Sequence, residues 1–438
     1  MKIGFISLGC AKNLVDSEMI LSILKKAGCI IVNDPVEADA IFINTCGFIE
    51  PAKAETIATI KEMKEYGKKL IVTGCYAYRY KEKLLKEMPF IDRVIPLTDY
   101  PKIHLILEDV FRDYNLKFQP LKYEERLLTG SPYTPYVKIS EGCNNNCTYC
   151  AIPLIRGKFR SRTIEDIVAE CRLLVESGAV ELNLISQDTT RFGADWSNDG
   201  RSKLPELLRE VSKIANVQMI RILYLYPDEI TDELIQEVKN NPLVANYFDI
   251  PIQHISSKIL KRMNRRGKKD FIINLLNKIR KEIPNSIIRT TYIVGFPGET
   301  EEDFQELYDF TKEFEFDRLG VFTYSKEEDT ASFDFPNQIE ESVKIDRLNQ
   351  IMKLQKQISR KRNRNLRNTE HLTIVENYDP ESKFYYGRSY AFAPDDIDGM
   401  IVFQSKKPLN EGDVVNVLIK SNFEYDLIGD AIFEEVKA

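Results

Sequence analysis

The sequence predicts an α/β protein made of three consecutive parts: a parallel α/β sheet domain, an incomplete (β/α) barrel and a small antiparallel β-barrel. Short β-branched runs alternate with amphipathic helical stretches over residues 1–100, and the same alternation restarts at residue 136. From about residue 370 onward, only short alternating runs separated by turn residues follow. The 438 residues, 43% hydrophobic and 29% charged, are enough for about three domains.

The first part is expected to span residues 1–120 and to form a mostly parallel sheet covered by helices. Its expected strands are KIGFISL (2–8), AIFINT (40–45), KLIVT (69–73) and RVIPL (93–97). Helices are expected over VDSEMILSILKKAG (15–28), after Pro51 and after residue 75. The pattern then loosens, and GSPYTPY (130–136) has the turn residues of a linker.

The second part is expected to span residues 130–366. Its expected strands are YVKIS (136–140), VELNLIS (180–186), QMIRIL (218–223), YFDI (247–250), IIRTTYIV (287–294) and LGVFTY (319–324), each followed by a helical stretch. Six such units predict an incomplete barrel of the TIM type, with its chemistry at the C-terminal ends of the strands. A charged helix is expected over about 340–366, and it ends in the basic run RKRNRNLR (360–367).

The third part, residues 367–438, is expected to be a small antiparallel, OB-like barrel. Its expected strands are HLTIVEN (371–377), YYGRSYAF (385–392), GMIVFQ (399–404), DVVNVLI (413–419) and DLIGDAIF (426–433).

Net charge and hydropathy narrow the possible partners and the compartment. The formal net charge of −6 gives no global electrostatic case for a nucleic-acid partner. The first apolar run ends at Cys10, too short for a signal peptide, and no window approaches the ~18 apolar residues of a membrane helix. We therefore expect no membrane association and a cytoplasmic location, where thiols stay reduced and clustered cysteines more often bind metal.

Three cysteines form a compact CxxxCxxC group in SEGCNNNCTYC (140–150): Cys143, Cys147 and Cys150. A structural zinc site has four ligands, and the nearest downstream histidine, His254, is over a hundred residues away. An iron–sulfur cube held by three cysteines keeps one iron free, which is typical of a substrate site. Gly142 and the three asparagines are expected to take turn and left-handed conformations that aim N–H groups at a negative centre. A zinc knuckle or a redox pair is the alternative.

Three further cysteines each lie just past an expected strand: Cys10, Cys46 and Cys75. The ends of parallel strands converge on one edge of a sheet, where ligands bind in open α/β folds. The three could therefore make a second three-thiolate site, although any one of them could equally be a small buried apolar residue. Cys29 and Cys171 are expected to be core residues, since Cys171 shares an apolar helical face.

The CxxxCxxC loop after the first barrel strand, with Tyr149 before the third cysteine, resembles the radical S-adenosylmethionine (SAM) superfamily. The whole chain resembles a methylthiotransferase through SLGCAKNLVDSE (7–18), NTCGFIEPA (44–52), TGCYA (73–77) and the small barrel at its end. The resemblance implies a methylthiotransferase N-terminal domain over 1–120, a TIM-like radical SAM barrel over 130–366 and a TRAM domain over 367–438.

The resemblance also implies the cofactors, which are two [4Fe–4S] clusters and SAM. The free iron of the Cys143–Cys147–Cys150 cluster would bind SAM, and the cluster of Cys10, Cys46 and Cys75 would hold the sulfur to be inserted. The SAM contacts that it implies are Tyr149, Gln187, Arg289 and Gly295.

Several of these contacts have competing explanations. Gln187 stands where many superfamily members have Gly-Gly-Glu, and ISQ lacks those glycines. Gly295 lies in YIVGFPGET (292–300), which could equally be a turn followed by a helix cap at Thr300 and Asp303. Four alternating cations follow the compact loop and could offset its charge or be solvated: Arg156, Lys158, Arg160 and Arg162.

The acceptor follows from a closer resemblance within the family, which divides between tRNA-adenosine enzymes and a branch that modifies an aspartate of small-subunit ribosomal protein twelve. The stretches that resemble the ribosomal-protein branch include ISQDTT (185–190), LYLYP (223–227) and DIPIQHIS (249–256). Residues 370–438 hold 14 acidic and 6 basic residues, a net charge of −8, which suits a basic protein partner better than RNA.

Some alternatives stay open at this point. RKRNRNLR could touch RNA, or could be a helix end where cations suit the helix dipole. The rival functions are a tRNA adenosine methylthiotransferase and a non-enzymatic module with structural zinc. The family also implies an electron donor of the flavodoxin or ferredoxin type, and a contact with the ribosome is open.

Overall fold

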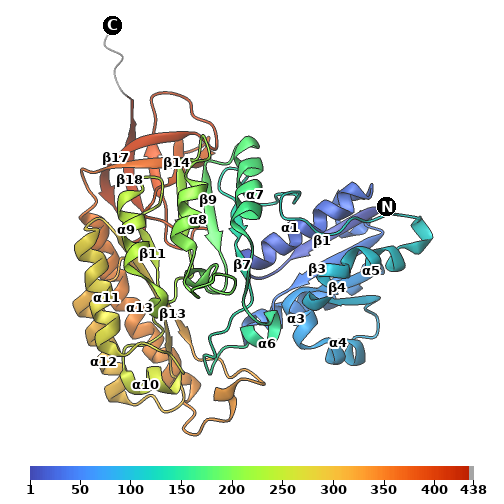
Figure 1. The fold of residues 1–438 in the computed structure, drawn as a ribbon, viewed down its shortest axis with the longest axis horizontal. Helices are drawn as coiled ribbons and strands as arrows, with labels where there is room; N and C mark the ends of the chain where they lie inside the picture. The colour runs from blue at the N-terminus through green and yellow to red at the C-terminus, as the bar shows by residue number, and fades with distance from the viewer. Residues whose placement is uncertain (434–438) are drawn as a thin grey trace.

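The computed structural model describes residues 1–433, which form three parts that follow one another along the chain (Figure 1). The N-terminal part lies at one side of the molecule, the large central part fills the middle, and the C-terminal barrel covers one end of the central part. The last five residues of the expected C-terminal domain, 434–438, lie outside the described residues.

The N-terminal part is a five-stranded, wholly parallel sheet with strand order β2-β1-β3-β4-β5. Its strands are β1 (Lys2–Ser7), β2 (Ile30–Val32), β3 (Ala40–Thr45), β4 (Lys69–Thr73) and β5 (Arg93–Pro96). Its helices are α1 (Ala11–Lys26), η1 (Pro35–Glu37), α2 (Glu50–Lys64), α3 (Gly74–Arg79), α4 (Lys81–Glu87), η2 (Leu97–Lys102), α5 (Ile103–Val110) and η3 (Arg112–Tyr114). The predicted parallel sheet covered by helices is confirmed.

Helix α1 is buried on nearly every side, polar residues included. Its carboxylates Asp16 and Glu18 are buried, and residues from later in the chain satisfy them. Lys138 binds Asp16, and Arg126 binds Glu18 with an N–O distance of 2.7 Å. Because a buried carboxylate is stable only when it is paired, this polar face fixes the N-terminal part against the central part.

The central part contains six parallel strands in two three-stranded sheets, β6-β9-β10 and β11-β12-β13. A parallel bridge between Ile220 and Val244 joins them, so the strands run in sequence order around an incomplete barrel, as predicted. The strands are β6 (Tyr136–Lys138), β9 (Glu181–Ile185), β10 (Met219–Ile222), β11 (Tyr247–Asp249), β12 (Ile287–Val294) and β13 (Arg318–Thr323). A two-stranded antiparallel sheet, β7 (Ser140–Glu141) with β8 (Arg160–Ser161), follows β6.

The longer helices of the central part cover the outer face of this barrel, and the shorter ones lie in its loops. They are α6 (Ile152–Arg156), α7 (Ile164–Glu176), η4 (Thr189–Arg191), α8 (Leu204–Val211), η5 (Pro227–Glu229), α9 (Asp232–Asn240), α10 (Ser257–Arg262), α11 (Lys269–Glu282), α12 (Glu301–Phe314), η6 (Ala331–Asp334) and α13 (Glu341–Arg364). A capping box of Thr300 and Asp303 starts α12, as expected. Helix α13 matches the charged helix predicted over about 340–366.

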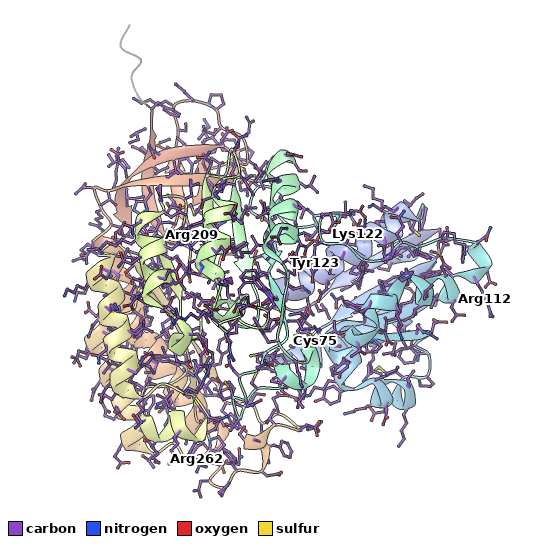
Figure 2. All side chains as sticks on the ribbon, in the orientation of Figure 1. Cys75, Arg112, Lys122, Tyr123, Arg209 and Arg262 are labelled. Carbon is purple, nitrogen blue, oxygen red and sulfur yellow. The ribbon has the colours of Figure 1, made fainter. Side chains whose placement is uncertain are left out.

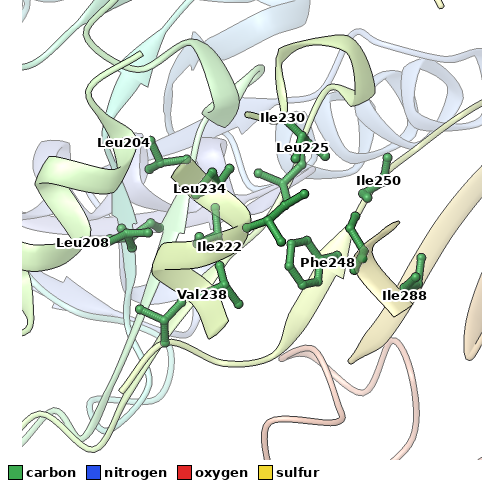
Figure 3. Close-up of a cluster of buried hydrophobic side chains, with 14 of the residues drawn as sticks. Leu204, Leu208, Ile222, Leu225, Ile230, Leu234, Val238, Phe248, Ile250 and Ile288 are labelled. Atoms are coloured by element: carbon green, nitrogen blue, oxygen red, sulfur yellow. The ribbon is translucent and has the colours of Figure 1, made fainter. Parts of the chain in front are cut away.

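The main core lies between the strands and these helices (Figure 3). Ile222 of β10, Phe248 of β11 and Ile288 of β12 belong to it together with Leu208 of α8 and Leu234 of α9. Cys171 is fully buried in the same core, and Cys29 is buried in the core of the N-terminal part. Both predictions of a packing role are therefore confirmed.

The C-terminal part is a closed five-stranded barrel of order β14-β15-β16-β18-β17. Its strands are β14 (Glu370–Asp379), β15 (Phe384–Arg388), β16 (Ile401–Gln404), β17 (Val414–Asn422) and β18 (Leu427–Ile432). The predicted small barrel is confirmed, but β16 and β18 pair in parallel rather than antiparallel. A closed ring with an odd number of strands cannot alternate in direction at every pairing, so one parallel pair is required.

The C-terminal barrel packs against the starting ends of the central strands. Arg221 donates to the carbonyl oxygens of Ser389 at 3.0 Å and Tyr390 at 2.9 Å, and Arg388 pairs with Glu181, the first residue of β9. The loop with Cys143, Cys147 and Cys150 lies beyond the other end of β6, so the C-terminal barrel and this cysteine loop lie at opposite ends of the central strands. No helix within residues 1–433 is long and apolar enough to cross a membrane.

Candidate active site

The three distant cysteines come together at one edge of the N-terminal sheet, as predicted. Cys10 precedes the first turn of α1, Cys46 follows β3 directly, and Cys75 lies in the first turn of α3. Gly9 has φ +96°, and a Cβ there would lie 3.2 Å from the Cys46 sulfur. A Cβ on Gly47 would lie 3.2 Å from the carbonyl carbon of Cys75. The glycines beside two of the cysteines therefore let the three segments pack closely.

The thiols of this group differ in their electrostatic environment. Burial raises the pKa of the Cys75 thiol to about 12, although Arg156 lowers it in part. Cys10 is exposed at its surface but surrounded by protein charges. Burial raises the pKa of Cys10, but the charges of Lys12 and Arg156 and two backbone N–H groups outweigh it, so the pKa lies below its usual range. The group thus combines one activated thiol with a buried one.

Asn13 links the segments that carry the three cysteines. Its side-chain N–H groups donate to the carbonyl oxygens of Leu8 at 3.0 Å and Thr45 at 2.9 Å, just before Cys10 and Cys46. Its amide oxygen accepts from the Cys75 thiol at 3.4 Å. One buried amide therefore fixes all three strand ends relative to one another.

The compact group lies in the loop between β7 and β8. The N–H of Cys143 donates to the carbonyl oxygen of Gly157 at 3.1 Å, and the N–H of Asn145 lies 3.4 Å from the Cys143 sulfur. Gly142 has φ +77°, as predicted. The expected left-handed asparagines are not found, because none of the three has a positive φ. Asn145 instead donates from its side chain to buried Asp188 at 2.6 Å, which fixes the loop by a side-chain bond.

Cys143 of the compact group is buried, and Cys147 and Cys150 are partly exposed. Burial raises the pKa of Cys143 to about 11 and raises that of Cys150 further. The Cys147 sulfur lies 3.6 Å from the Tyr226 hydroxyl, and the Arg265 guanidinium lies over the Tyr226 ring, 4.1 Å from its centre. A hydroxyl thus adjoins the Cys147 thiol, and a cation lies over the ring that carries this hydroxyl.

The chemistry of the two donor sets fits iron–sulfur clusters. Each set offers three thiols, the ligands that such clusters use, and each has a cation close by. Within residues 1–433, no group of three or more His, Cys, Asp and Glu side chains could hold a metal ion as the side chains stand. The finding applies equally to iron–sulfur clusters and to structural zinc, the alternative considered from the sequence.

Three of the four expected SAM contacts lie near the cysteine loops. Tyr149 packs edge-on against Phe296, with ring centres 6.4 Å apart, and Phe296 follows Gly295 directly. Gln187 donates to the Glu141 carboxylate at 3.1 Å, next to the compact loop, and its own amide oxygen is buried without a hydrogen-bond partner.

Arg289 is the exception among the four. It lies near the starting end of β12, where it pairs with Asp249 at 2.8 Å and with Asp398 of the C-terminal barrel at 3.3 Å. The structure therefore groups Arg289 with the barrel junction rather than with the cysteine loops.

The four alternating cations after the compact loop divide into two pairs. Arg156 and Arg162 are held in ion pairs, and Lys158 and Arg160 are exposed. Arg156 contacts Cys75 of the distant group rather than its own loop, with an N–S distance of 3.5 Å. The sequence did not indicate this contact, because 81 positions separate the two residues.

Several residues of the site were not foreseen from the sequence: Asn13, Asp16, Lys138, Glu141, Asp188, Tyr226 and Arg265. Asn13, Asp16, Asp188 and Tyr226 lie within the motifs 7–18, 185–190 and 223–227, and Glu141 lies in the stretch 140–150, whereas Lys138 and Arg265 carry no such signal.

Comparison with known proteins agrees with the arrangement of the three parts. Residues 137–311 match the model of the Radical SAM superfamily, residues 2–96 match the Uncharacterized protein family UPF0004, and residues 369–432 match the TRAM domain. Two solved structures have a similar fold at 13% identity. They are the radical SAM methyltransferase TsrM from Kitasatospora setae (TM-score 0.54, 74% of each chain) and the enzyme OxsB (TM-score 0.51, 80% of this chain and 56% of the other).

Full-length relatives are much more similar. Proteins named ribosomal protein uS12 methylthiotransferase RimO are 49% identical in Acetivibrio thermocellus (100% of this chain, 99% of the relative) and 48% identical in Geobacter sulfurreducens (98% of each). A third, from Clostridium novyi, is 48% identical over 98% of this chain and 97% of the relative. The predicted resemblance is confirmed, and the chain belongs to the RimO family of the radical SAM methylthiotransferases.

Proposed function

We propose that the chain adds a methylthio group to the β-carbon of an aspartate in ribosomal protein uS12, small-subunit protein twelve, and that it uses SAM and two [4Fe–4S] clusters. The observation that carries the proposal is 49% identity over the whole chain to a protein named uS12 methylthiotransferase. The two separate three-thiol groups add support, since a sulfur-inserting enzyme needs a second reactive centre besides the one that acts on SAM.

The chain's own residues supply the binding sites. Cys143, Cys147 and Cys150 would hold one cluster, and Cys10, Cys46 and Cys75 would hold the other. When bound, the clusters and SAM supply the radical chemistry, the sulfur and the methyl group. The protein orients them and excludes water, to which the buried thiols of Cys75 and Cys143 contribute.

Tyr149, Gln187 and Gly295 are the proposed SAM contacts. The buried and unpartnered amide oxygen of Gln187 supports this role, since such an atom gains from accepting a hydrogen bond from a ligand. Arg289 is already engaged by Asp249 and Asp398, so its contact with SAM stays a prediction.

The charge of the C-terminal part favours a protein acceptor over tRNA. A cavity of about 500 Å³ opens between α1, the linker and the C-terminal barrel, and its lining includes Glu18, Glu376, Asp395 and Asp396. The cations at the end of α13 are held by the chain itself: Lys361 pairs with Glu315, and Arg362 with Asp317. An acidic surface with two of the five cations of its basic run paired in this way suits a basic protein better than a phosphate backbone.

The proposal also includes the cellular compartment, the electron donor and the limits of the three domains. All eight cysteines are free, which supports a reducing compartment and thus the cytoplasm. We propose a flavodoxin- or ferredoxin-type electron donor, leave a contact with the ribosome open, and propose domains over 1–120, 130–366 and 367–438.

Iron analysis and product analysis test the proposal together. After anaerobic reconstitution, the full chain should bind about eight irons, and the triple variants C10A/C46A/C75A and C143A/C147A/C150A about four each. Cys171→Ala is the matched control, because this cysteine is a core residue, and it should keep about eight. Mass spectrometry of a uS12 substrate should detect a methylthiolated aspartate. Methylthiolated tRNA nucleoside with unmodified uS12 would overturn the acceptor.

A further inference from the structure

Arg156 lies between the two cysteine groups: it contacts Cys75 of the distant group and Glu141, which precedes the compact group. It is the last residue of α6, and it is 5% exposed. Figure 2 shows its neighbour Cys75 at the boundary between the N-terminal part and the segment that contains α6. A buried guanidinium at such a boundary requires partners for its charge and its N–H groups.

On the side of the distant group, Arg156 contacts the residues that fix the cysteines. One terminal nitrogen lies 3.5 Å from the Cys75 sulfur, and the same nitrogen donates to the amide oxygen of Asn13. Asn13 in turn bonds the backbone before Cys10 and before Cys46. Arg156 thereby contacts Asn13, the residue that bonds all three cysteine segments.

On the side of the compact group, Arg156 binds Glu141. Its other terminal nitrogen lies 3.1 Å and 3.0 Å from the two oxygens of this carboxylate, two residues before Cys143. Glu141 also accepts from Gln187, a proposed SAM contact. Arg156 and Glu141 therefore connect Cys75 with the compact loop across this boundary.

The charges around Arg156 balance one another before any cluster is bound. Asp16 lies 3.0 Å from Arg156, and Lys138 binds both Asp16 and Glu141. Two cations and two carboxylates thus balance each other in this pocket. A cluster held by three thiolates adds negative charge on the side where Arg156 contacts Cys75.

We propose that Arg156 is a positioning residue that ties the two cluster sites together and raises the reduction potential of the cluster held by Cys10, Cys46 and Cys75. This inference rests on the proposed function. A positive charge beside a cluster stabilises the reduced, more negative form, and charge and hydrogen bonds near the sulfurs are what set such potentials. Because Arg156 also binds Glu141, it holds the two sites at a fixed separation.

The test isolates one cluster in the full chain. In the C143A/C147A/C150A background, the potential of the remaining cluster is measured by redox titration followed by electron paramagnetic resonance. Arg156→Gln should lower the ratio of reduced to oxidised cluster at least tenfold at a fixed potential, a fall of about 59 mV for one electron. Arg156→Lys keeps the charge and should restore the ratio to within about threefold, or about 30 mV.

Arg162→Gln is the matched control. Arg162 is also held by buried Glu170 in this region, at 2.5 Å, but it contacts no cysteine. It should leave the potential unchanged. If Arg156→Gln alone loses the iron while Arg156→Lys and Arg162→Gln keep it, the positioning role is also supported.

Two results would overturn the inference. One is an intact cluster in Arg156→Gln with the potential of the parent, and the other is equal loss of iron in Arg156→Gln and Arg162→Gln, which a purely structural role would give. Failure of the parent background to bind iron would instead contradict the proposed second cluster, and the role of Arg156 with it.

Discussion

At the scale of single residues, the loop after β12 contains a buried carboxylate with an unusual protonation range. Glu299 is 2% exposed; its carboxylate accepts from the N–H of Phe296 at 3.1 Å and from Arg347 at 2.9 Å. Burial raises its pKa to about 7, although Arg347 lowers it in part. Burial lowers the pKa of neighbouring His254 to about 3, so the histidine is neutral and does not pair with Glu299 as a cation.

This raised pKa predicts a pH-dependent stability difference between Glu299→Gln and the wild type. The folded state holds the Glu299 proton up to about pH 7, so its contribution is complete below the ordinary glutamate pKa and is lost as pH rises toward 7. From about pH 5.5 the wild type should lose about 1.4 kcal/mol per pH unit relative to the variant, with a slope that decreases near pH 7 and levels off by about pH 8.

Urea midpoints from pH 5.5 to 8 measure this difference. Glu301→Gln is the matched control, because Glu301 binds the same Arg347 at 3.2 Å but is 73% exposed. The difference in urea midpoint between Glu301→Gln and the wild type should not change with pH over this range. A flat difference for Glu299→Gln as well would contradict the raised pKa.

At the scale of elements, the sequence predicted what depends on local patterns. The six central strands and the five barrel strands all overlap the expected runs, because apolar periodicity and turn residues are properties of a few neighbouring positions. The cysteines at the ends of β1, β3 and β4 could also be placed at one sheet edge, since parallel strands end on the same side.

The contacts between elements could not be predicted in the same way. Asp16 and Glu18 belong to a helix that reads as amphipathic, yet both are buried against cations more than a hundred positions away. Nothing in a local pattern distinguishes a solvated carboxylate from one whose partner lies in another domain. The asparagines of the compact loop were misjudged for a related reason, since Asp188 offered Asn145 a side-chain bond that the loop sequence does not reveal.

The loop after β13 fastens helices α2 and α3 to the central part, and this gives a prediction for one element contact. Glu327 pairs with Lys53 of α2 at 3.0 Å and with Arg79 of α3 at 2.7 Å, and all three side chains are at most 8% exposed. Glu327→Ala leaves two buried cations without this partner and should cost about 3 kcal/mol of stability.

Urea denaturation and limited proteolysis of the loop 324–331 measure that cost. Cleavage there should accelerate in Glu327→Ala, since the loop loses its attachment to α2 and α3. Glu233→Ala removes an ion pair with Arg209 in which both side chains are about half exposed, and it should change stability by less than about 0.5 kcal/mol. Equal effects of the two substitutions would contradict the attachment.

At the scale of the whole molecule, the incomplete barrel serves as a platform with two different ends. The compact cysteine loop lies beyond the finishing end of its first strand, and the C-terminal barrel is docked at the starting ends through Glu181, Arg221 and Tyr247. The acidic barrel thus does not line the cysteine site. If the C-terminal barrel holds a basic substrate, it does so at the cavity that it forms with α1 and the linker.

The docking of the C-terminal barrel depends on one buried carboxylate, which leads to the last prediction. Glu181 is fully buried and binds Arg221 at 2.8 Å and Arg388 at 2.5 Å. Burial alone would raise its pKa, but the two guanidinium groups hold the pKa below its usual range, so the carboxylate is charged. Glu181→Gln leaves two buried arginines without their counter-charge and should cost about 3 to 5 kcal/mol.

Glu376→Gln is the control, because it also removes a charge partner of Arg388 without removing a contact between the two barrels. Glu376 binds Arg388 at 2.9 Å and is 27% exposed. Only Glu181→Gln should free the C-terminal barrel, because Glu376 belongs to that barrel itself. Limited proteolysis between α13 and β14 should then release the barrel faster in Glu181→Gln than in Glu376→Gln or the wild type. Equal cleavage rates in all three proteins would mean that the apolar contacts alone hold the barrel in place.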